Sequence, residues 1–281
     1  MTSATMAAAA ARVTGDVLGA PIDVIDWPTA LNRIAAWGKA RESRYVCICN
    51  VHSVITARQD AGFARVLAES DMNTPDGAPV AWLLRRHGFV SQQRINGPDL
   101  MWRHAERAAQ TGQPIFLYGG TDATLARLCE ALLAAFPALV IAGHYSPPFR
   151  ALTAEEDDAA VTRINASGAE MVWVGLGCPK QENWMAAHRG RVKAVMIGVG
   201  AAFDYHAGTI RRAPLWMRNA GLEWVFRLVS EPRRLAGRYI VTNTTFIGLV
   251  GRGSLLGRRL PSANEARLQK QGDEEHDRGT R

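Results

Sequence analysis

The residue best suited to acid–base chemistry is Asp76, in the segment Asn73-Thr-Pro-Asp-Gly77. A carboxylate held on a turn can accept the proton of a substrate hydroxyl and so act as a general base. Pro-Asp-Gly is also a common turn sequence, so a purely structural turn is the alternative. Further along, Arg94 and Asp99 flank a predicted helix start, where Asp99 could do no more than stabilise the first turn.

Two glycine turns could approach a phosphate. Gly119-Gly120 follows the apolar run Ile115–Tyr118, and Gly175-Leu-Gly177 follows Met171–Val174. Glycine lets the backbone come close to a ligand, and the N-terminus of a following helix offers free N–H groups to an anion. Lys180, just beyond the second turn, would add a cation there. Tight packing of strand against helix is the alternative for both turns.

These residues need a scaffold, and the apolar pattern predicts a parallel sheet. Short apolar runs of strand length alternate with helical patterns, which is typical of an α/β fold with helices on both faces of a Rossmann-like sheet. The predicted strands are Tyr45–Cys49, Ile115–Tyr118, Leu139–Ala142, Met171–Val174 and Ala194–Val199. The clearest predicted helices are Thr121–Phe136 and Thr153–Asn165, the second opening with a capping box, and Pro179 is placed at the first position of another helix. In open parallel sheets, ligands bind beyond the carboxyl ends of the strands.

Composition divides the 281 residues into four parts. Residues 1–13 are Ala-rich and are predicted to be a disordered leader, and 14–204 form the α/β catalytic domain. Residues 205–260 combine aromatics with ten arginines and two glutamates, so we expect a basic helical appendage facing an anionic partner, with a solvated basic face as the alternative. Residues 261–281 are polar and are predicted to be a disordered tail.

The remaining composition restricts cofactors and location. Four cysteines without zinc-ligand spacing are typical of buried free thiols in a reducing cytosol, and no segment is long and apolar enough to span a bilayer. The ordered stretches contain no Asp-x-Asp pair and no metal-spaced His, Cys and Asp cluster. We therefore expect no metal and no other cofactor, and a cytoplasmic protein that is soluble or attached to a membrane surface.

Taken in order, the motifs resemble the WecG/TagA/CpsF glycosyltransferases, glycosyltransferase family 26. The resemblance runs from about residue 14 to 245. The matching stretches are Asn50-Val-His-Ser, Thr74-Pro-Asp-Gly77, Arg94-Ile-Asn-Gly-Pro-Asp99, Tyr118-Gly-Gly120, Gly175-Leu-Gly-Cys-Pro-Lys-Gln-Glu182, Gly198-Val-Gly-Ala-Ala-Phe-Asp204 with Ala207-Gly208, Arg212-Ala-Pro214, Gly221-Leu-Glu-Trp224 and Arg227-Leu-Val-Ser-Glu-Pro232.

The resemblance implies an inverting enzyme of bacterial surface polysaccharide or exopolysaccharide synthesis. Such enzymes move a sugar from a UDP-sugar to a polyprenyl-diphosphate-linked saccharide at the inner face of the cytoplasmic membrane. By this resemblance Asp76 is the general base and Arg94 a second catalytic residue. The implied UDP-sugar site comprises Asn50, Thr74, Gly119, Gly120, Gly177, Lys180, Gln181, Glu182 and Asp204. Arginines for the acceptor diphosphate and the membrane surface are Arg211, Arg212, Arg227, Arg233, Arg234 and Arg238.

The residues also support this chemistry independently. An inverting transfer needs one base for the acceptor hydroxyl and positive charge for the departing UDP. Backbone N–H groups, Lys180 and arginines can supply that charge, which predicts metal-independent activity.

Some questions stay open from the sequence. Ile48 and Cys49 stand where some members carry hydroxyl residues, and Pro98 is a further variation. Nothing separates N-acetylmannosamine, its uronic acid or glucose as the donor sugar, and a homo-oligomer stays open.

The alternatives are a nucleotide-cofactor enzyme such as an NAD oxidoreductase, a nucleic-acid-binding module and a non-catalytic scaffold. The first lacks the third fingerprint glycine. The second would need no Asp76, and we expect no nucleic-acid partner.

Overall fold

The structure is a computed structural model that describes residues 12–255, apart from the side chains of Arg234, Arg238 and residues 253–255. The predicted leader falls mostly outside this range, and the predicted tail over 261–281 falls wholly outside it. The last two residues of the predicted leader, Arg12 and Val13, contact the folded chain. Arg12 forms an ion pair with Asp23 at 2.8 Å, and the carbonyl of Val13 accepts from the Val24 N–H.

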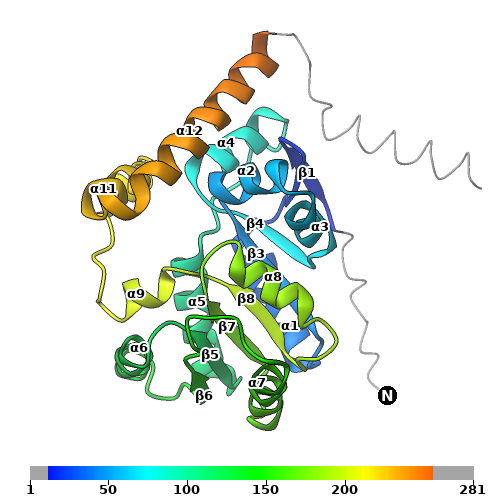
Figure 1. The fold of residues 1–281 in the computed structure, drawn as a ribbon, viewed down its shortest axis with the longest axis vertical. Helices are drawn as coiled ribbons and strands as arrows, with labels where there is room; N and C mark the ends of the chain where they lie inside the picture. Colours follow the sequence, from blue (N-terminus) through cyan, green and yellow to red (C-terminus); the bar gives the residue numbers. More distant parts are fainter. Residues whose placement is uncertain (1–11, 256–281) are drawn as a thin grey trace, which may run out of the picture.

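The centre of the molecule is a six-stranded sheet, all of whose pairings are parallel, in the order β4-β3-β8-β7-β5-β6 (Figure 1). Its strands are β3 (Arg44–Cys49), β4 (Met72–Pro75), β5 (Ile115–Gly119), β6 (Ile141–Tyr145), β7 (Met171–Gly175) and β8 (Val195–Gly198). The predicted α/β fold with a parallel sheet is confirmed. All five predicted strands are present, although β6 begins two residues later than expected.

Strand β4 is the one that the sequence pattern missed. Its four residues, Met72–Pro75, read as part of a turn because they include Asn, Thr and Pro, yet all four are buried. Proline cannot donate to a strand ladder, so it is tolerated in a sheet chiefly at an edge. β4 is an edge strand and Pro75 is its last residue, which explains how this polar sequence extends the sheet.

Helices cover both faces of the sheet, as predicted. Alternate strand residues point to opposite faces, so Tyr45, Cys47 and Cys49 belong to one buried cluster, whereas Val46 and Ile48 belong to the other. The first face carries α2 (Val51–Gln59), α3 (Ala61–Glu69), α7 (Ala154–Ala166) and α8 (Lys180–Ala187), and the second carries α1 (Trp27–Lys39), α5 (Gly97–Thr111), α6 (Asp122–Ala135) and α9 (Ala202–His206). A hairpin, β1 (Thr14–Val17) and β2 (Ala20–Asp23), packs against α4 (Ala78–Arg86).

Side-chain caps fix most of the predicted helix starts. Thr121 caps α6, and Thr153 with Glu156 forms the predicted capping box of α7. The placement of Pro179 inside a helix is wrong: α8 starts at Lys180, and Pro179 precedes it after a cis peptide bond. All four cysteines are free, and Cys47 and Cys49 are buried, as expected.

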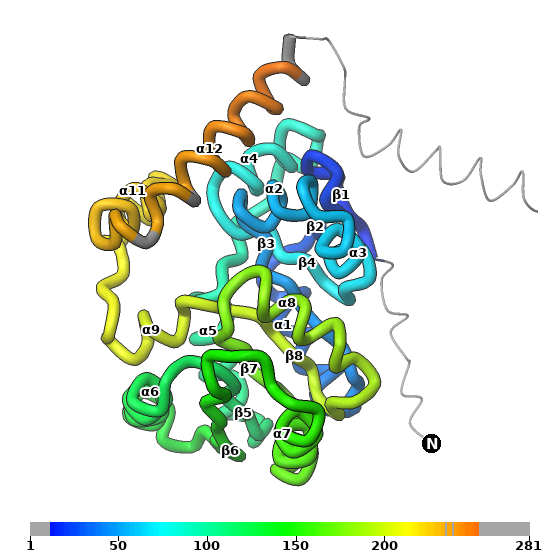
Figure 2. Tube along the Cα trace, viewed as in Figure 1, coloured from blue at the N-terminus to red at the C-terminus, as the bar shows by residue number. Residues whose placement is uncertain are grey.

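The C-terminal segment is helical, as predicted. It contains α10 (Leu215–Asn219), α11 (Glu223–Ser230) and α12 (Pro232–Leu255). The chain trace in Figure 2 shows α12 extending past α2 at the upper end of the molecule, and Phe246 of α12 is buried in the cluster that includes α2. Within residues 12–255, no helix has the length and apolar character needed to cross a bilayer.

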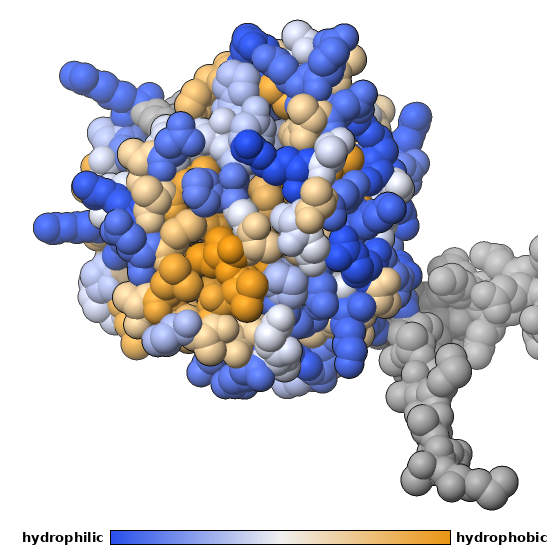
Figure 3. All heavy atoms as spheres, turned by 90° about the horizontal axis from the view of Figure 1, so that it is seen from below, coloured by the Kyte–Doolittle hydropathy of each residue, from blue (hydrophilic) through white to orange (hydrophobic). Residues whose placement is uncertain are grey.

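The opposite end of the molecule presents an apolar patch to solvent. Viewed from below, the face that carries α6 and β6 shows apolar atoms gathered among hydrophilic ones (Figure 3). Leu133 of α6 and Val140, directly before β6, are exposed.

Candidate active site

Because the strands are parallel, their carboxyl ends meet at one edge of the sheet, and the residues singled out by the sequence follow those ends. Asn50 follows β3, Asp76 follows β4, and Gly120 follows β5. Gly177 follows β7 after one intervening residue. This edge is where open α/β sheets bind ligands.

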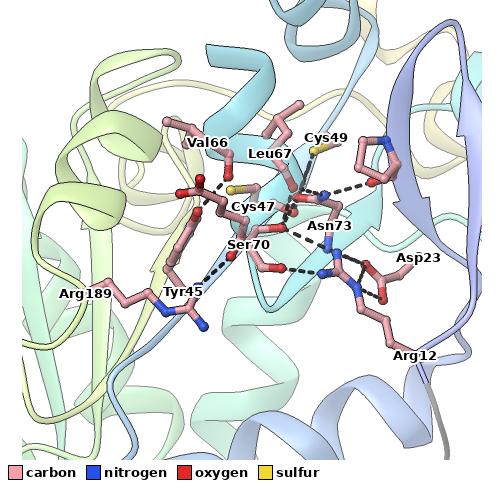
Figure 4. Close-up of polar contacts among 12 residues, drawn as sticks. Arg12, Asp23, Tyr45, Cys47, Cys49, Val66, Leu67, Ser70, Asn73 and Arg189 are labelled. Carbon is pink, nitrogen blue, oxygen red and sulfur yellow. Dashed lines mark hydrogen bonds and ion pairs between the residues drawn. The ribbon is translucent and has the colours of Figure 1, made fainter. Parts of the chain in front are cut away.

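A buried polar network fixes β4 and therefore the loop that carries the carboxylate after it (Figure 4). The Asn73 N–H donates to Asp23 at 2.6 Å, and the Asn73 side-chain amide donates to the carbonyls of Pro21 and Leu67, both at 2.7 Å. Burial raises the pKa of Asp23, and hydrogen bonds from Arg12 oppose this shift. A satisfied buried network of this kind specifies one position for the strand.

Asp76 is held on both its main chain and its side chain. Its N–H donates to the carbonyl of Cys49 at 2.9 Å, which ties the loop to the end of β3. Its carboxylate accepts from Arg94 Nε at 3.2 Å, and its side chain remains 17% exposed. Burial raises the pKa of Asp76, while the Arg94 charge opposes the shift. A raised pKa makes a carboxylate a better proton acceptor, and partial exposure leaves it open to a substrate.

A row of alternating charges extends from this carboxylate into the C-terminal segment. Arg94 also donates to Glu223, the first residue of α11. Glu223 in turn accepts from Arg212 Nε at 3.4 Å, and Arg212 donates to Asp99 at 2.6 Å. Asp99 therefore does more than stabilise a helix start. Glu223 is a site residue that sequence reasoning missed; its signal was that it is one of only two acids among the ten arginines of 205–260.

The turn before α11 lies against the helix that follows Asp76. Gly221 has a φ of +73°, a conformation that side chains disfavour, and a Cβ there would lie 2.6 Å from the Cβ of Ala78 in α4. Glycine therefore permits the close approach that brings Glu223 to Arg94.

The first glycine turn has a packing function. Gly119 has a φ of +111°, and a Cβ there would lie 2.8 Å from the backbone of Gly175. A Cβ on Gly175 would lie 2.6 Å from the Phe203 ring. Both glycines thus allow β5, β7 and α9 to approach closely, and a ligand contact at Gly119 and Gly120 stays a prediction.

The second glycine turn is joined to a buried carboxylate. The Gly177 N–H donates to Gln181 Oε1 at 3.1 Å, and Gln181 Nε2 donates to Glu182 Oε1 at 2.9 Å. Glu182 is only 1% exposed, and burial raises its pKa to about 6. Lys180 is exposed at the first position of α8.

A comparison with models of known protein families identifies the family of the chain. The model of the glycosyl transferase WecG/TagA/CpsF family matches residues 15–260, which is most of the chain. The chain belongs to this family. WecG/TagA/CpsF enzymes are UDP-sugar glycosyltransferases that transfer sugars to lipid-linked acceptors in surface polysaccharide biosynthesis, so the resemblance seen in the sequence is confirmed.

Three other residues expected at the UDP-sugar site of this WecG/TagA/CpsF enzyme form hydrogen bonds within the protein. Asn50 caps α2 by accepting from the N–H groups of His52 and Ser53. The buried Thr74 hydroxyl donates to the carbonyl of Ile95 at 3.1 Å, and Asp204 accepts from a neighbouring threonine hydroxyl at 3.2 Å. Their contacts to a donor sugar stay predictions.

The C-terminal arginines of the WecG/TagA/CpsF enzyme are spread over different environments. Arg212 lies in the row of charges that starts at Asp76, between Glu223 and Asp99, and Arg227 lies over the Tyr205 ring, 5.7 Å from its centroid. Arg211 and Arg233 are exposed. The side chains of Arg234 and Arg238 lie outside the described part. Among the described residues, no group of three or more His, Cys, Asp or Glu side chains could hold a metal ion.

Proposed function

We propose that this enzyme is an inverting glycosyltransferase with Asp76 as its general base. The donor is a UDP-sugar carrying N-acetylmannosamine, its uronic acid or glucose, and the acceptor is a polyprenyl-diphosphate-linked saccharide. The observation that carries the proposal is the position of Asp76: it follows β4 at the carboxyl edge of the sheet, is partly exposed and has a raised pKa.

In the proposed reaction, Asp76 accepts the proton of an acceptor hydroxyl as its oxygen attacks the anomeric carbon of the donor. The bond from that carbon to the UDP oxygen breaks on the opposite side, so an α-linked donor gives a β-linked product. Negative charge then grows on the departing diphosphate, and preorganised cations stabilise such charge most effectively. Arg94, which bonds Asp76, and Arg212, which bonds the same Glu223 as Arg94, supply these positive charges, so we propose metal-independent transfer.

We also propose that the enzyme works peripherally on the inner face of the cytoplasmic membrane. Two features of the C-terminal helices support this. Trp216 of α10, Val229 of α11 and Ile247 of α12 are exposed apolar side chains, and Arg211 and Arg233 are exposed cations. Interfacial helices combine apolar and basic side chains in this way.

The test is transfer from each of the three UDP-sugars to a lipid-diphosphate-linked saccharide, with and without EDTA. We expect one donor to be used, a β-linkage by NMR and the same rate in EDTA. An α-linked product would contradict single displacement. Loss of activity in EDTA that magnesium restores would contradict the metal-free proposal.

A further inference from the structure

A cavity of about 310 Å³ adjoins Arg94, between α4, the start of α5 and α10. Its lining is strongly basic, since it includes Arg85, Arg94, Arg103, Arg212 and Arg218. Among the described side chains that line it, Asp99 is the one carboxylate.

The neighbouring carboxylates do not balance these cations. Asp76 and Glu223 pair with Arg94, Glu223 and Asp99 pair with Arg212, and Arg218 lies 3.8 Å from the same Asp99. Three carboxylates thus face five guanidinium groups, which leaves a surplus of two positive charges. Burial acts to raise the pKa of Asp99, but the hydrogen bond from Arg212, together with the neighbouring groups, outweighs it and keeps that pKa below its usual value. Asp99 is therefore one of the three negative charges in this balance.

Three of the arginines keep donors available. Arg85 donates to the backbone carbonyl of Gln92 at 2.9 Å, and Arg103 lies over the Trp27 ring at 4.3 Å from its centroid. Neither forms an ion pair with a carboxylate within residues 12–255. The Nε–H of Arg218 is buried with no hydrogen-bond acceptor in the described part of the chain.

We propose that this cavity binds a substrate diphosphate, with Arg85, Arg103 and Arg218 as its ligands. Guanidinium groups hold phosphate oxygens in paired hydrogen bonds, and a diphosphate carries at least the two negative charges that the surplus requires. The inference rests on the proposed function and deepens it, because Arg94 connects the cavity to Asp76. The diphosphate belongs either to the UDP-sugar or to the lipid-linked acceptor.

The test uses calorimetric titration of the full chain with UDP and, separately, with farnesyl diphosphate. The double variant Arg85→Gln/Arg103→Gln is compared with Arg86→Gln/Arg107→Gln. The control removes the same charge from the same two helices, at arginines outside the cavity that contact Trp82 and Asn32.

Each hydrogen bond between charged groups accounts for about tenfold in affinity. We expect the cavity variant to bind at least one probe roughly tenfold to 100-fold more weakly, and the control variant to change by less than about twofold. Arg218→Gln should weaken the same probe.

The two titrations also identify the source of the diphosphate. Loss for UDP alone assigns the cavity to the donor, loss for farnesyl diphosphate alone to the acceptor, and loss for both to a shared site. Unchanged affinity for both probes, or equal loss in the control variant, overturns the inference.

The proposed function fails separately from this inference. If the wild-type enzyme transfers no sugar while the cavity variant still loses diphosphate affinity, the binding site stands without the reaction. If transfer proceeds and the cavity variant keeps both affinities and its KM for both substrates, the reaction stands without the site.

Discussion

At the residue scale, the pKa of Asp76 is set by its burial and by the charged side chains around it. Asp76 has a raised pKa because burial outweighs the opposing effect of Arg94, and Glu223 contributes to the same upward shift. Since Glu223 also bonds Arg94, the base shares its cation with a second carboxylate. A base that shares its counter-ion keeps a greater affinity for the substrate proton than one with a cation to itself.

Glu182 gives a residue-scale prediction about pH. Its pKa is about 6 in the folded enzyme against 4.5 for an ordinary glutamate, so the folded state prefers it protonated. This contribution to stability is complete below about pH 4.5 and is lost as the pH rises through about 6. Glu182→Gln cannot ionise and does not lose this contribution. The free energy of unfolding of the variant minus that of the wild type should therefore rise by about 2 kcal/mol from pH 4 to pH 7.5.

Denaturant unfolding at a series of pH values measures this difference. Glu156→Gln is the comparison, because Glu156 is only partly buried and hydrogen bonds from Arg150 and from the Thr153 backbone lower its pKa to about 2, the opposite direction to Glu182. A difference between Glu182→Gln and wild type that does not change with pH would show that burial does not govern Glu182.

At the element scale, the C-terminal helices complete the site. Helix α11 begins with Glu223 and reaches Arg94 only because the turn at Gly221 lies against Ala78 of α4. Helix α12 then packs over α2, with Phe246 buried. These helices therefore contribute to the position of Asp76, the proposed catalytic base.

Gly221→Ala tests that element-scale contact. The added Cβ would meet Ala78 at 2.6 Å and occupy a left-handed conformation, which costs about 1–2 kcal/mol for a side chain. We expect α11 to shift away from α4, with kcat falling by about tenfold or more as Glu223 leaves Arg94. Gly237→Ala in α12, where a Cβ meets nothing within 4 Å, should leave kcat unchanged. Equal kcat for both variants would contradict this contact.

The sequence predicted those features that depend on residues close together in the chain, and it missed those that depend on distant ones. Apolar runs identified five strands, and the capping box at Thr153 gave one helix start, because these signals depend on neighbouring residues. Strand β4 was missed because its polar residues are satisfied by Asp23 and Pro21, fifty or so positions away. Glu223 and Arg218 were missed as site residues for the same reason: their partners come from distant parts of the chain.

At the scale of the whole molecule, charge and apolar surface are concentrated in one region. The basic cavity adjoins α10, and the helices α10–α12 carry exposed Trp216, Val229, Ile240 and Ile247. A substrate with a lipid tail and a diphosphate presents the complementary groups. This arrangement is consistent with the proposed membrane surface beside the active site.

Vesicle flotation tests the proposed membrane contact. Each exposed apolar side chain that enters the interface contributes up to about 1.5–3 kcal/mol. Trp216→Ser/Ile247→Ser should therefore bind anionic vesicles at least about tenfold more weakly. Val90→Ser/Phe149→Ser, at exposed apolar side chains outside these helices, should bind like the wild type. Equal binding by both double variants would exclude α10 and α12 as the membrane contact.

The most direct test of the central claim is turnover by Asp76→Asn. Asparagine keeps the size of the side chain and can still face Arg94, but it cannot accept the hydroxyl proton. We predict that transfer to the lipid-linked acceptor falls by at least about 100-fold, in line with a general base, while the Kd for UDP stays within about twofold of the wild type. Transfer at the wild-type rate would show that Asp76 is not the base.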